Sequence, residues 1–327
     1  MGNRTVDVVV GIDGGGTKTR AVVVALDGRL LGEALGPSSN FQMLGPEKTA
    51  AVLHGCVREA LERVSGGQVR VRCVSACLAG VGRPSDRRQA LQALQALEIA
   101  PHYRVESDAM GALAGAFAGG EGIILIAGTG TICLGKGADG RVERAGGWGY
   151  LLGDEGSGYY IGQQAIVGAL KDLDGRGPTT RLRSFLEARY ELERIDRIIP
   201  KIYQGEIDRT EIAAIAPHVF EIAANGDEVA MEIIRRAAEE LAKLAVAVGR
   251  RLAWSTGVAQ IAPIGSLFRQ FDVLQPHMER VFQQEAFAHR FVEPLFDPAI
   301  GAAILGLEEE GVRIEDSVLR NLRSSAR

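Results

Sequence analysis

The chain has 327 residues, of which 46% are hydrophobic and 24% are charged. Because a single hydrophobic core rarely grows past roughly 250–300 residues, this length predicts two domains. The 37 basic and 41 acidic residues give a net charge of −4 without a long run of one sign, which argues against a nucleic-acid partner. No apolar run approaches the ~20 residues of a membrane span, and the N-terminus lacks the regions of a signal peptide. We therefore expect a cytoplasmic protein without membrane partners.

The spacing of cysteines and histidines predicts neither a metal site nor a set of disulfide bonds. The cysteines form no CxxC pair, and the five histidines lack ligand spacing. We expect reduced core cysteines and no histidine in metal binding or catalysis. The cysteines are Cys56, Cys73, Cys77 and Cys133.

The first 117 residues are typical of a mixed sheet with helices on its faces. Strands are predicted at 6–12, 19–26 and 30–34, the last two joined by a tight turn at Asp27-Gly28. A helix is predicted from Pro46 to Val64, with proline at its start. The remaining predicted elements are a strand at 71–79, a helix at 85–97, a strand at 103–106 and a helix at 108–117.

The strand pattern then restarts, which indicates an internal duplication. Strands are predicted at 122–127, 131–135 and 141–145. Beyond Gly156 the sequence becomes mostly helical, with a 3.6-residue apolar period from 228 to 252. A strand at 258–264 leads into Gly265-Ser266, and the last helix is predicted to begin near Pro298.

Two strand–turn–strand units carry the strongest chemical signal. Residues 8–24 hold DGGGTK at their turn, and residues 123–135 hold GTGT. Glycines and threonines at a tight turn expose backbone N–H groups that can surround a phosphate without a Cβ in the way. Asp13 ends the first strand, where a carboxylate can hold Mg²⁺ through water. Because the motif occurs twice, the pattern favours a polyphosphate held from two sides over two ordinary hairpins.

Two better-known phosphate motifs do not fit. Thr17 precedes Lys18 and a strand follows, so the first turn is not a Walker P-loop. Residues 135–140 match G-x-G-x-x-G, but a turn and a strand follow instead of a helix, so no helix N-terminus is available for a pyrophosphate.

At these hairpins the sequence resembles the actin-like ATPase superfamily of sugar kinases, actin and heat-shock chaperones. It is most similar there to the N-acetylglucosamine kinases and the BadF-type ATPase family. The resemblance runs from Gly11 to GAAILG at 301–306, and its most specific part is GGWGYLLGDEGSGYYIG at 146–162. It implies a two-lobed α/β fold (actin-like, ribonuclease H-like) with duplicated mixed sheets, flanking helices and a central ATP cleft. The implied lobes are 1–117 with a C-terminal helix at about 298–327, and 118–297, mostly helical after 156.

The resemblance also implies an activity, the ATP-dependent phosphorylation of an N-acetylhexosamine or related amino sugar. The first candidate substrate is N-acetylglucosamine, phosphorylated on its 6-hydroxyl. ATP and Mg²⁺ are the implied cofactors, and a homodimer is the expected assembly. The implied nucleotide contacts are Asp13 (with Mg²⁺), Gly14, Gly15, Gly16, Thr17, Lys18, Gly128, Thr129, Gly130, Thr131, Gly265 and Ser266. The implied sugar contacts are Asn40, Asp108, Gly147, Trp148, Gly149 and Asp154, with Asp108 also the catalytic base.

Each of these assignments has a local alternative. Asp108 lies at a strand-to-helix junction, where an N-cap aspartate is common, yet hydroxyl phosphorylation also requires a base. Asp154 precedes a helix and is also a candidate cap. Asn40 follows a turn-rich stretch that favours asparagine, and Trp148 stands between glycines, an unusual place for a core tryptophan. Lys18 is open to either a phosphate or solvent.

The alternative function is that of a BadF-type ATPase that activates a partner reductase or dehydratase. Such activators carry an iron–sulfur cluster, which requires accessible cysteine thiolates. A sugar-responsive regulator would require a helix-turn-helix before Gly11, where only ten residues stand. The sequence leaves open which amino sugar is used: N-acetylglucosamine, glucosamine or N-acetylmuramic acid.

Overall fold

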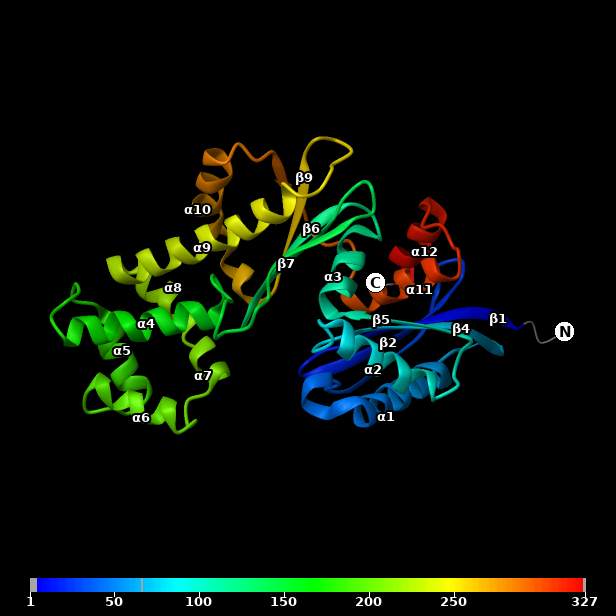
Figure 1. Ribbon diagram of the computed structural model, residues 1–327, viewed down its shortest axis with the longest axis horizontal. Helices are drawn as coiled ribbons and strands as arrows, with labels where there is room; N and C mark the ends of the chain where they lie inside the picture. Colours follow the sequence, from blue (N-terminus) through cyan, green and yellow to red (C-terminus); the bar gives the residue numbers. More distant parts are fainter. Residues whose placement is uncertain (1–4, 66, 326–327) are drawn as a thin grey trace. The chain divides into compact units, whose positions relative to one another are not determined.

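The structure is a computed structural model that describes residues 5–65 and 67–325. The chain forms two compact units (Figure 1). Unit 1 comprises Met1–Gly122 and Glu293–Arg327, and unit 2 comprises Ile123–Val292. The sequence analysis placed the two changes of unit near residues 117 and 297, a few residues away from these bounds.

Unit 1 is built on a five-stranded mixed sheet in the order β3-β2-β1-β4-β5. β1 pairs antiparallel with β2 and parallel with β4, so it occupies the centre of the sheet. Its Val8–Val10 run is fully buried, as expected for a central strand covered on both faces. The strands are β1 (Val6–Gly14), β2 (Lys18–Ala25), β3 (Leu30–Pro37), β4 (Val69–Leu78) and β5 (His102–Ser107).

Helices cover both faces of this sheet (Figure 1). Val8 and Val10 pack with Leu53 of α1 on one face, and Val9 packs with Ile300 of α11 on the other. This alternation along β1 follows from the two-residue period of a strand. The helices of unit 1 are α1 (Phe41–Glu62), α2 (Pro84–Gln95), α3 (Asp108–Phe117), α11 (Pro298–Glu309) and α12 (Asp316–Ser325).

One predicted helix start is wrong, and one helix was missed. α1 begins at Phe41 and not at Pro46, because Asn40 caps it by accepting a hydrogen bond from Gln42 N–H at 3.0 Å. Gly45 has a φ of +74° and interrupts the helix, so Pro46 starts a second segment, where its missing N–H needs no partner. The helix predicted near Pro298 does begin there, but it is not the last one, because α12 follows it.

Unit 2 repeats the strand order of unit 1. Its sheet has the order β10-β9-β6-β7-β8, and reading it from β8 gives the same arrangement as reading unit 1 from β3. The predicted internal duplication is therefore confirmed, although the short edge strand β10 was not predicted. The strands are β6 (Gly122–Ala127), β7 (Thr131–Lys136), β8 (Val142–Gly146), β9 (Ala259–Ile264) and β10 (His289–Phe291).

The rest of unit 2 is mostly helical, as predicted for the region beyond Gly156. None of the helices within residues 5–65 and 67–325 combines the length and apolarity needed to cross a membrane. The helices are α4 (Gly158–Leu173), α5 (Arg181–Arg189), α6 (Ile198–Tyr203), α7 (Arg209–Ala213), α8 (Ala216–Ala224), α9 (Glu228–Gly249) and α10 (Phe271–Gln284), with 3-10 turns η1 (Ile195–Arg197) and η2 (Ser266–Gln270).

Candidate active site

The first glycine–threonine hairpin joins β1 to β2 in unit 1. Gly15 N–H donates to Lys18 O at 3.0 Å, which closes the turn, and Ala79 N–H donates to Gly14 O at 2.7 Å. The segment 38–40 braces the turn, because Ser38 Oγ and Ser39 N–H both donate to Gly15 O. Gly16, Thr17 and Lys18 are exposed. The hairpin is thus fixed from behind and open in front, as a phosphate-binding turn must be.

Asn40 caps a helix and lies near this hairpin. Its Oδ1 caps α1, while its Nδ2 lies 3.9 Å from the position that a Cβ on Gly16 would occupy. The cap uses Oδ1 alone, so Nδ2 takes no part in capping α1. The predicted contact between Asn40 and the sugar stays a prediction.

Asp13 and Asp108 are neighbours in unit 1. Burial and, after it, the charges of Asp108 and Asp297 together raise the pKa of Asp13 from 3.8 to about 6. Burial also raises the pKa of Asp108, although a hydrogen bond from Ala109 N–H at 2.9 Å opposes the shift. Asp108 as a whole residue is exposed to solvent. Many protein atoms nevertheless lie near its carboxylate, and their presence is what raises its pKa. Ser107 occupies the N-cap position of α3 without a side-chain capping hydrogen bond, and it is Asp108 that accepts an N–H of the first turn, from Ala109.

Asp297 is a third carboxylate in this group, and the sequence analysis did not assign it to the site. It caps α11 by accepting from Ala299 N–H at 2.9 Å and from Ile300 N–H at 3.2 Å. Its other oxygen forms an ion pair with Arg20 at 2.7 Å. An aspartate directly before Pro298 is a recognisable helix start. Its place beside Asp13 depends on the return of the chain to unit 1, which no local pattern shows.

Glycine contacts hold α3 and α11 together. A Cβ on Gly301 would lie 2.0 Å from Gly111 O and 2.4 Å from Gly115 N, and a Cβ on Gly11 would lie 2.3 Å from Ala303 N. The backbones of β1, α3 and α11 are therefore in direct contact. This packing fixes the N-termini of α3 and α11, and with them their first carboxylates, relative to the end of β1.

The pH dependence of stability offers a test of the Asp13 environment. The folded pKa of about 6 lies above the ordinary 3.8, so the folded state holds this proton more tightly than the unfolded chain. The stability of unit 1 should therefore fall as the pH rises from about 4 to about 6. We expect Asp13→Asn to raise the melting temperature at about pH 7.5 and not at about pH 4. Asp27→Asn, at an exposed turn, serves as the control, and an equal gain at both pH values would contradict the assignment.

The second hairpin joins β6 to β7 in unit 2 and is also braced from behind. Thr131 N–H donates to Asp154 Oδ1 at 3.2 Å, and Thr131 Oγ1 donates to Glu155 O at 3.1 Å. Gly158 N–H, at the start of α4, donates to Gly128 O at 2.8 Å. Thr131 is buried and uses both donors inside the unit, whereas Thr129 is exposed. Thr129 is therefore the threonine of this turn that is available to a ligand.

Asp154 lies behind this hairpin. Its side chain is only 4% exposed, and its Oδ2 forms an ion pair with Arg209 Nη2 at 3.1 Å. A Cβ on Gly130 would lie 2.7 Å from Arg209 Nη2 and 2.8 Å from Asp154 Oδ2, so a larger residue here would displace this side-chain pair. Asp154 thus supports the hairpin in this structure, and its predicted sugar contact stays a prediction. Sequence analysis gave no signal for Arg209.

The segment 147–153 forms an exposed apolar loop. Gly147 and Gly149 have φ values of +70° and +85°, a backbone region that favours glycine. Trp148 between them is 69% exposed, and Arg144 places its guanidinium carbon 4.4 Å from the centre of the tryptophan ring. A tryptophan this exposed contributes little to a core, so its large apolar surface is available to a ligand.

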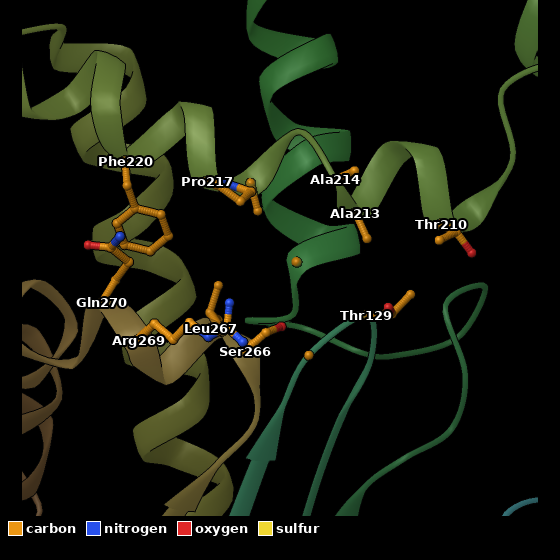
Figure 2. Close-up of a pocket in the computed structure, with 13 residues that line it drawn as sticks. Thr129, Thr210, Ala213, Ala214, Pro217, Phe220, Ser266, Leu267, Arg269 and Gln270 are labelled. Atoms are coloured by element: carbon orange, nitrogen blue, oxygen red, sulfur yellow. The ribbon is translucent and has the colours of Figure 1, made fainter. Parts of the chain in front are cut away.

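A pocket of about 430 Å³ opens beside the second hairpin. Figure 2 shows Ala213, Ala214, Pro217 and Phe220, from α7, α8 and their connection, on one side and the residues of η2 on the other. Gly265 lies at a turn beside the pocket and has a φ of +116°, a backbone region that favours glycine. A Cβ at this position would also lie 2.3 Å from Ala127 O. The lining residues are Gly128, Thr129, Gly158, Thr210, Ala213, Ala214, Ala216, Pro217, Phe220, Ser266, Leu267, Arg269 and Gln270.

This pocket brings together two predicted nucleotide segments, the second hairpin and Gly265-Ser266. Small and apolar side chains form much of its wall, which suits a flat ring system, and the hairpin at its edge suits phosphates. The residues of α7 and α8 in the wall were not predicted, because an alanine-rich run such as 213–216 is equally typical of ordinary helix packing.

The cysteines lie in the core, as predicted, because all four are buried. Burial raises the pKa of the Cys73 thiol to about 12 and also raises those of Cys77 and Cys133. These thiols are therefore poor metal ligands and poor nucleophiles. In the part of the chain that the structure describes, no group of three or more His, Cys, Asp or Glu side chains could hold a metal ion.

Comparisons with known proteins agree with this arrangement. The chain is 33% identical over 303 residues to an N-acetylmuramic acid/N-acetylglucosamine kinase of Clostridium acetobutylicum, covering 92% of this chain and 98% of that protein. It is 29% identical to an N-acetyl-D-glucosamine kinase of Dictyostelium discoideum, covering 93% and 99%. A crystal structure from Chromobacterium violaceum, with a provisional N-acetylglucosamine kinase name, is 28% identical, covers 93% of this chain and 100% of that one, and gives a TM-score of 0.72.

These similarities and the two five-stranded sheets confirm the predicted α/β fold of the actin-like sugar kinases. The match to a family extends over residues 10–306, nearly the whole chain. The chain therefore belongs to the BadF/BadG/BcrA/BcrD ATPase family.

Proposed function

We propose that the protein is an ATP-dependent kinase that phosphorylates an N-acetylhexosamine or a related amino sugar. The first candidate substrate is N-acetylglucosamine, and the first candidate acceptor is its 6-hydroxyl group. One observation carries the proposal: a pocket with an apolar wall ends at a glycine–threonine hairpin within unit 2. That combination matches the two parts of a nucleotide, a flat base and a charged phosphate chain. The two curated relatives described above are named as amino-sugar kinases and match over most of the chain.

In this proposal the adenosine occupies the pocket beside Ser266, and Thr129 contacts the phosphates. The first hairpin supplies a second set of phosphate contacts, from Gly14 to Thr17, of which Gly16 and Thr17 are exposed to solvent. Backbone N–H groups and hydroxyls suit this task, since they stabilise phosphate charge without a proton transfer of their own.

Asp13 fits a role in holding Mg²⁺. Like charges and burial raise its pKa to about 6, and a cation beside it would relieve both costs. Magnesium is usually held by one or two carboxylates together with substrate phosphates, so a single aspartate is a sufficient protein contribution. When bound, the ion would neutralise charge on the phosphates.

Asp108 is the proposed general base. The sugar hydroxyl forms a new bond to the γ-phosphorus, the bond from that phosphorus to the departing ADP oxygen breaks, and the hydroxyl proton passes to a carboxylate oxygen of Asp108. The raised pKa of Asp108 makes this carboxylate a better proton acceptor than an ordinary aspartate. Its exposed surface leaves room for a substrate to reach it.

The proposed sugar contacts are Asn40 and Asp108 in unit 1 and Gly147, Trp148, Gly149 and Asp154 in unit 2. Trp148→Ala should raise the KM for the sugar by about tenfold or more, because an aromatic ring is a large contact surface for a pyranose. The KM for ATP should change little. Steady-state kinetics with each substrate varied in turn will measure both values, and a change confined to the KM for ATP would contradict this placement of Trp148.

The proposed activity is tested by ADP release with a panel of sugars. Purified protein with ATP and Mg²⁺ is assayed with N-acetylglucosamine, glucosamine, N-acetylmuramic acid and glucose, and without sugar. We expect release that depends on at least one amino sugar, with a phosphosugar as the second product. Release that is the same with and without every sugar would contradict the proposal and would favour the reductase-activating ATPase instead.

The proposal includes a cytoplasmic setting and a homodimer. Sedimentation velocity will measure the assembly: a single species at the monomer mass across micromolar concentrations would remove the dimer from the proposal.

A further inference from the structure

Arg209 lies at the centre of the contacts that brace the second hairpin. It is the first residue of α7, where Asp208 accepts hydrogen bonds from Thr210 N–H at 2.8 Å and from Glu211 N–H at 2.9 Å. These bonds fix the backbone from which the Arg209 side chain extends. The guanidinium group forms an ion pair with Asp154, and its central carbon lies 5.4 Å from the centre of the Tyr150 ring.

Asp154 presents an electrostatic problem at this place. Its carboxylate is almost fully buried and is close to the hairpin, with Oδ2 2.8 Å from where a Cβ on Gly130 would lie. Its other oxygen accepts the N–H of Thr131, which holds the turn. The same charge that orients the turn would therefore repel a phosphate bound in front of it.

We propose that Arg209 is a positioning residue that neutralises Asp154, so that this carboxylate can hold the Thr131 turn without opposing the approach of phosphates. The inference rests on the proposed nucleotide-binding role of the second hairpin. The ion pair, at 3.1 Å, supplies the neutralising charge. The Arg209 side chain is 41% exposed, so its charge also extends to the solvent side of the pair.

Two features favour neutralisation over a purely structural contact. A buried carboxylate with one backbone partner is costly, and a fully paired one is much less so. In addition, Thr210, Ala213 and Ala214, from the same helix and the residue after it, line the nucleotide pocket. Arg209 thus belongs to an element that is already fixed against the pocket wall.

The test compares four proteins by calorimetric titration with ADP, which needs no turnover: wild type, Arg209→Gln, Arg209→Gln with Asp154→Asn, and Arg194→Gln. Arg194 is the matched control, because it forms an ion pair with Asp196 at 2.7 Å on the surface of the same unit. Arg209→Gln should weaken ADP binding on the order of tenfold, since it leaves the Asp154 charge uncompensated. Adding Asp154→Asn removes that charge and should restore the affinity to within about threefold of wild type. Arg194→Gln should bind as wild type does.

The second substitution separates this inference from a simple structural role. If Arg209 only held the fold, removing its partner as well would not restore the affinity. An unchanged affinity in Arg209→Gln, or a double variant as weak as the single one, would overturn the inference. If Arg209→Gln is not folded by circular dichroism, Arg209→Lys keeps the charge and should bind ADP within about threefold of wild type. A tenfold loss in that folded lysine variant would also overturn the inference.

This experiment also separates the inference from the proposed function. A wild-type protein that binds no ADP would remove the nucleotide pocket itself. A wild type that binds ADP but phosphorylates no amino sugar would contradict only the proposed function, and the comparison of variants would still decide the role of Arg209.

Discussion

Asp108→Asn should lower kcat by ~10²–10⁴ while leaving ADP affinity close to that of wild type. Asparagine keeps the shape of the side chain and can still accept the N–H of Ala109, but it cannot take a proton from a hydroxyl. Burial raises the pKa of Asp108 toward the range in which a base works best near neutral pH. Turnover with the best amino sugar and calorimetry with ADP will measure the two quantities.

Asp316→Asn is the control for this prediction. Asp316 is likewise an acidic residue in the first turn of a unit 1 helix, and it is exposed. Its replacement should leave kcat within about twofold of wild type. Near-normal turnover in Asp108→Asn would remove this residue from the role of base, whatever the outcome for the nucleotide pocket.

Gly301→Ala should destabilise unit 1 by ~2–4 kcal/mol, a large effect for a single methyl group. The added Cβ would meet Gly111 O at 2.0 Å and Gly115 N at 2.4 Å, both backbone atoms that cannot move aside alone. α11 would have to move away from α3. Because Asp108 is the first residue of α3 and Asp297 caps α11, activity should fall together with stability. Urea unfolding followed by circular dichroism will measure the change.

Gly55→Ala is the matched control, because it makes the same substitution inside α1 with no atom within 4 Å of the new Cβ apart from the neighbouring backbone of its own helix. It should leave the protein unchanged or more stable by ~0.5–1 kcal/mol, since alanine is a better helix former than glycine. Equal stability of the two alanine variants would contradict the close packing of α3 against α11.

The sequence predicted those parts of the molecule that depend on local patterns. Central strands such as β1 are buried on both faces, so their apolar runs and bounding glycines could be read directly. The two glycine–threonine turns repeat the same signal, and this repetition also predicted the duplicated sheets. At Gly45-Pro46 the proline led to a wrong predicted start for α1. Pro46 begins only the second segment of this helix, and the cap of the first segment is Asn40, further upstream.

Side chains that join the site from distant parts of the chain were not predicted. Asp297 reaches the end of β1 only because α11 packs on unit 1, and Arg209 reaches Asp154 across 55 residues of sequence. The pocket wall at Phe220 and Gln270 likewise depends on how α8 and η2 pack. Such contacts depend on tertiary structure, so single-sequence periodicity contains no trace of them.

The order of segments in unit 1 has a consequence for how the protein is made. A ribosome releases β1 to α3 early, but Val9 and Val22 of that sheet are covered by Ile300 and Ile304, which emerge only after the whole of unit 2. Unit 2 is one continuous stretch and can complete its core first. During translation one apolar face of the unit 1 sheet is therefore uncovered until α11 has been made. Exposed apolar surface of this kind is what chaperones bind.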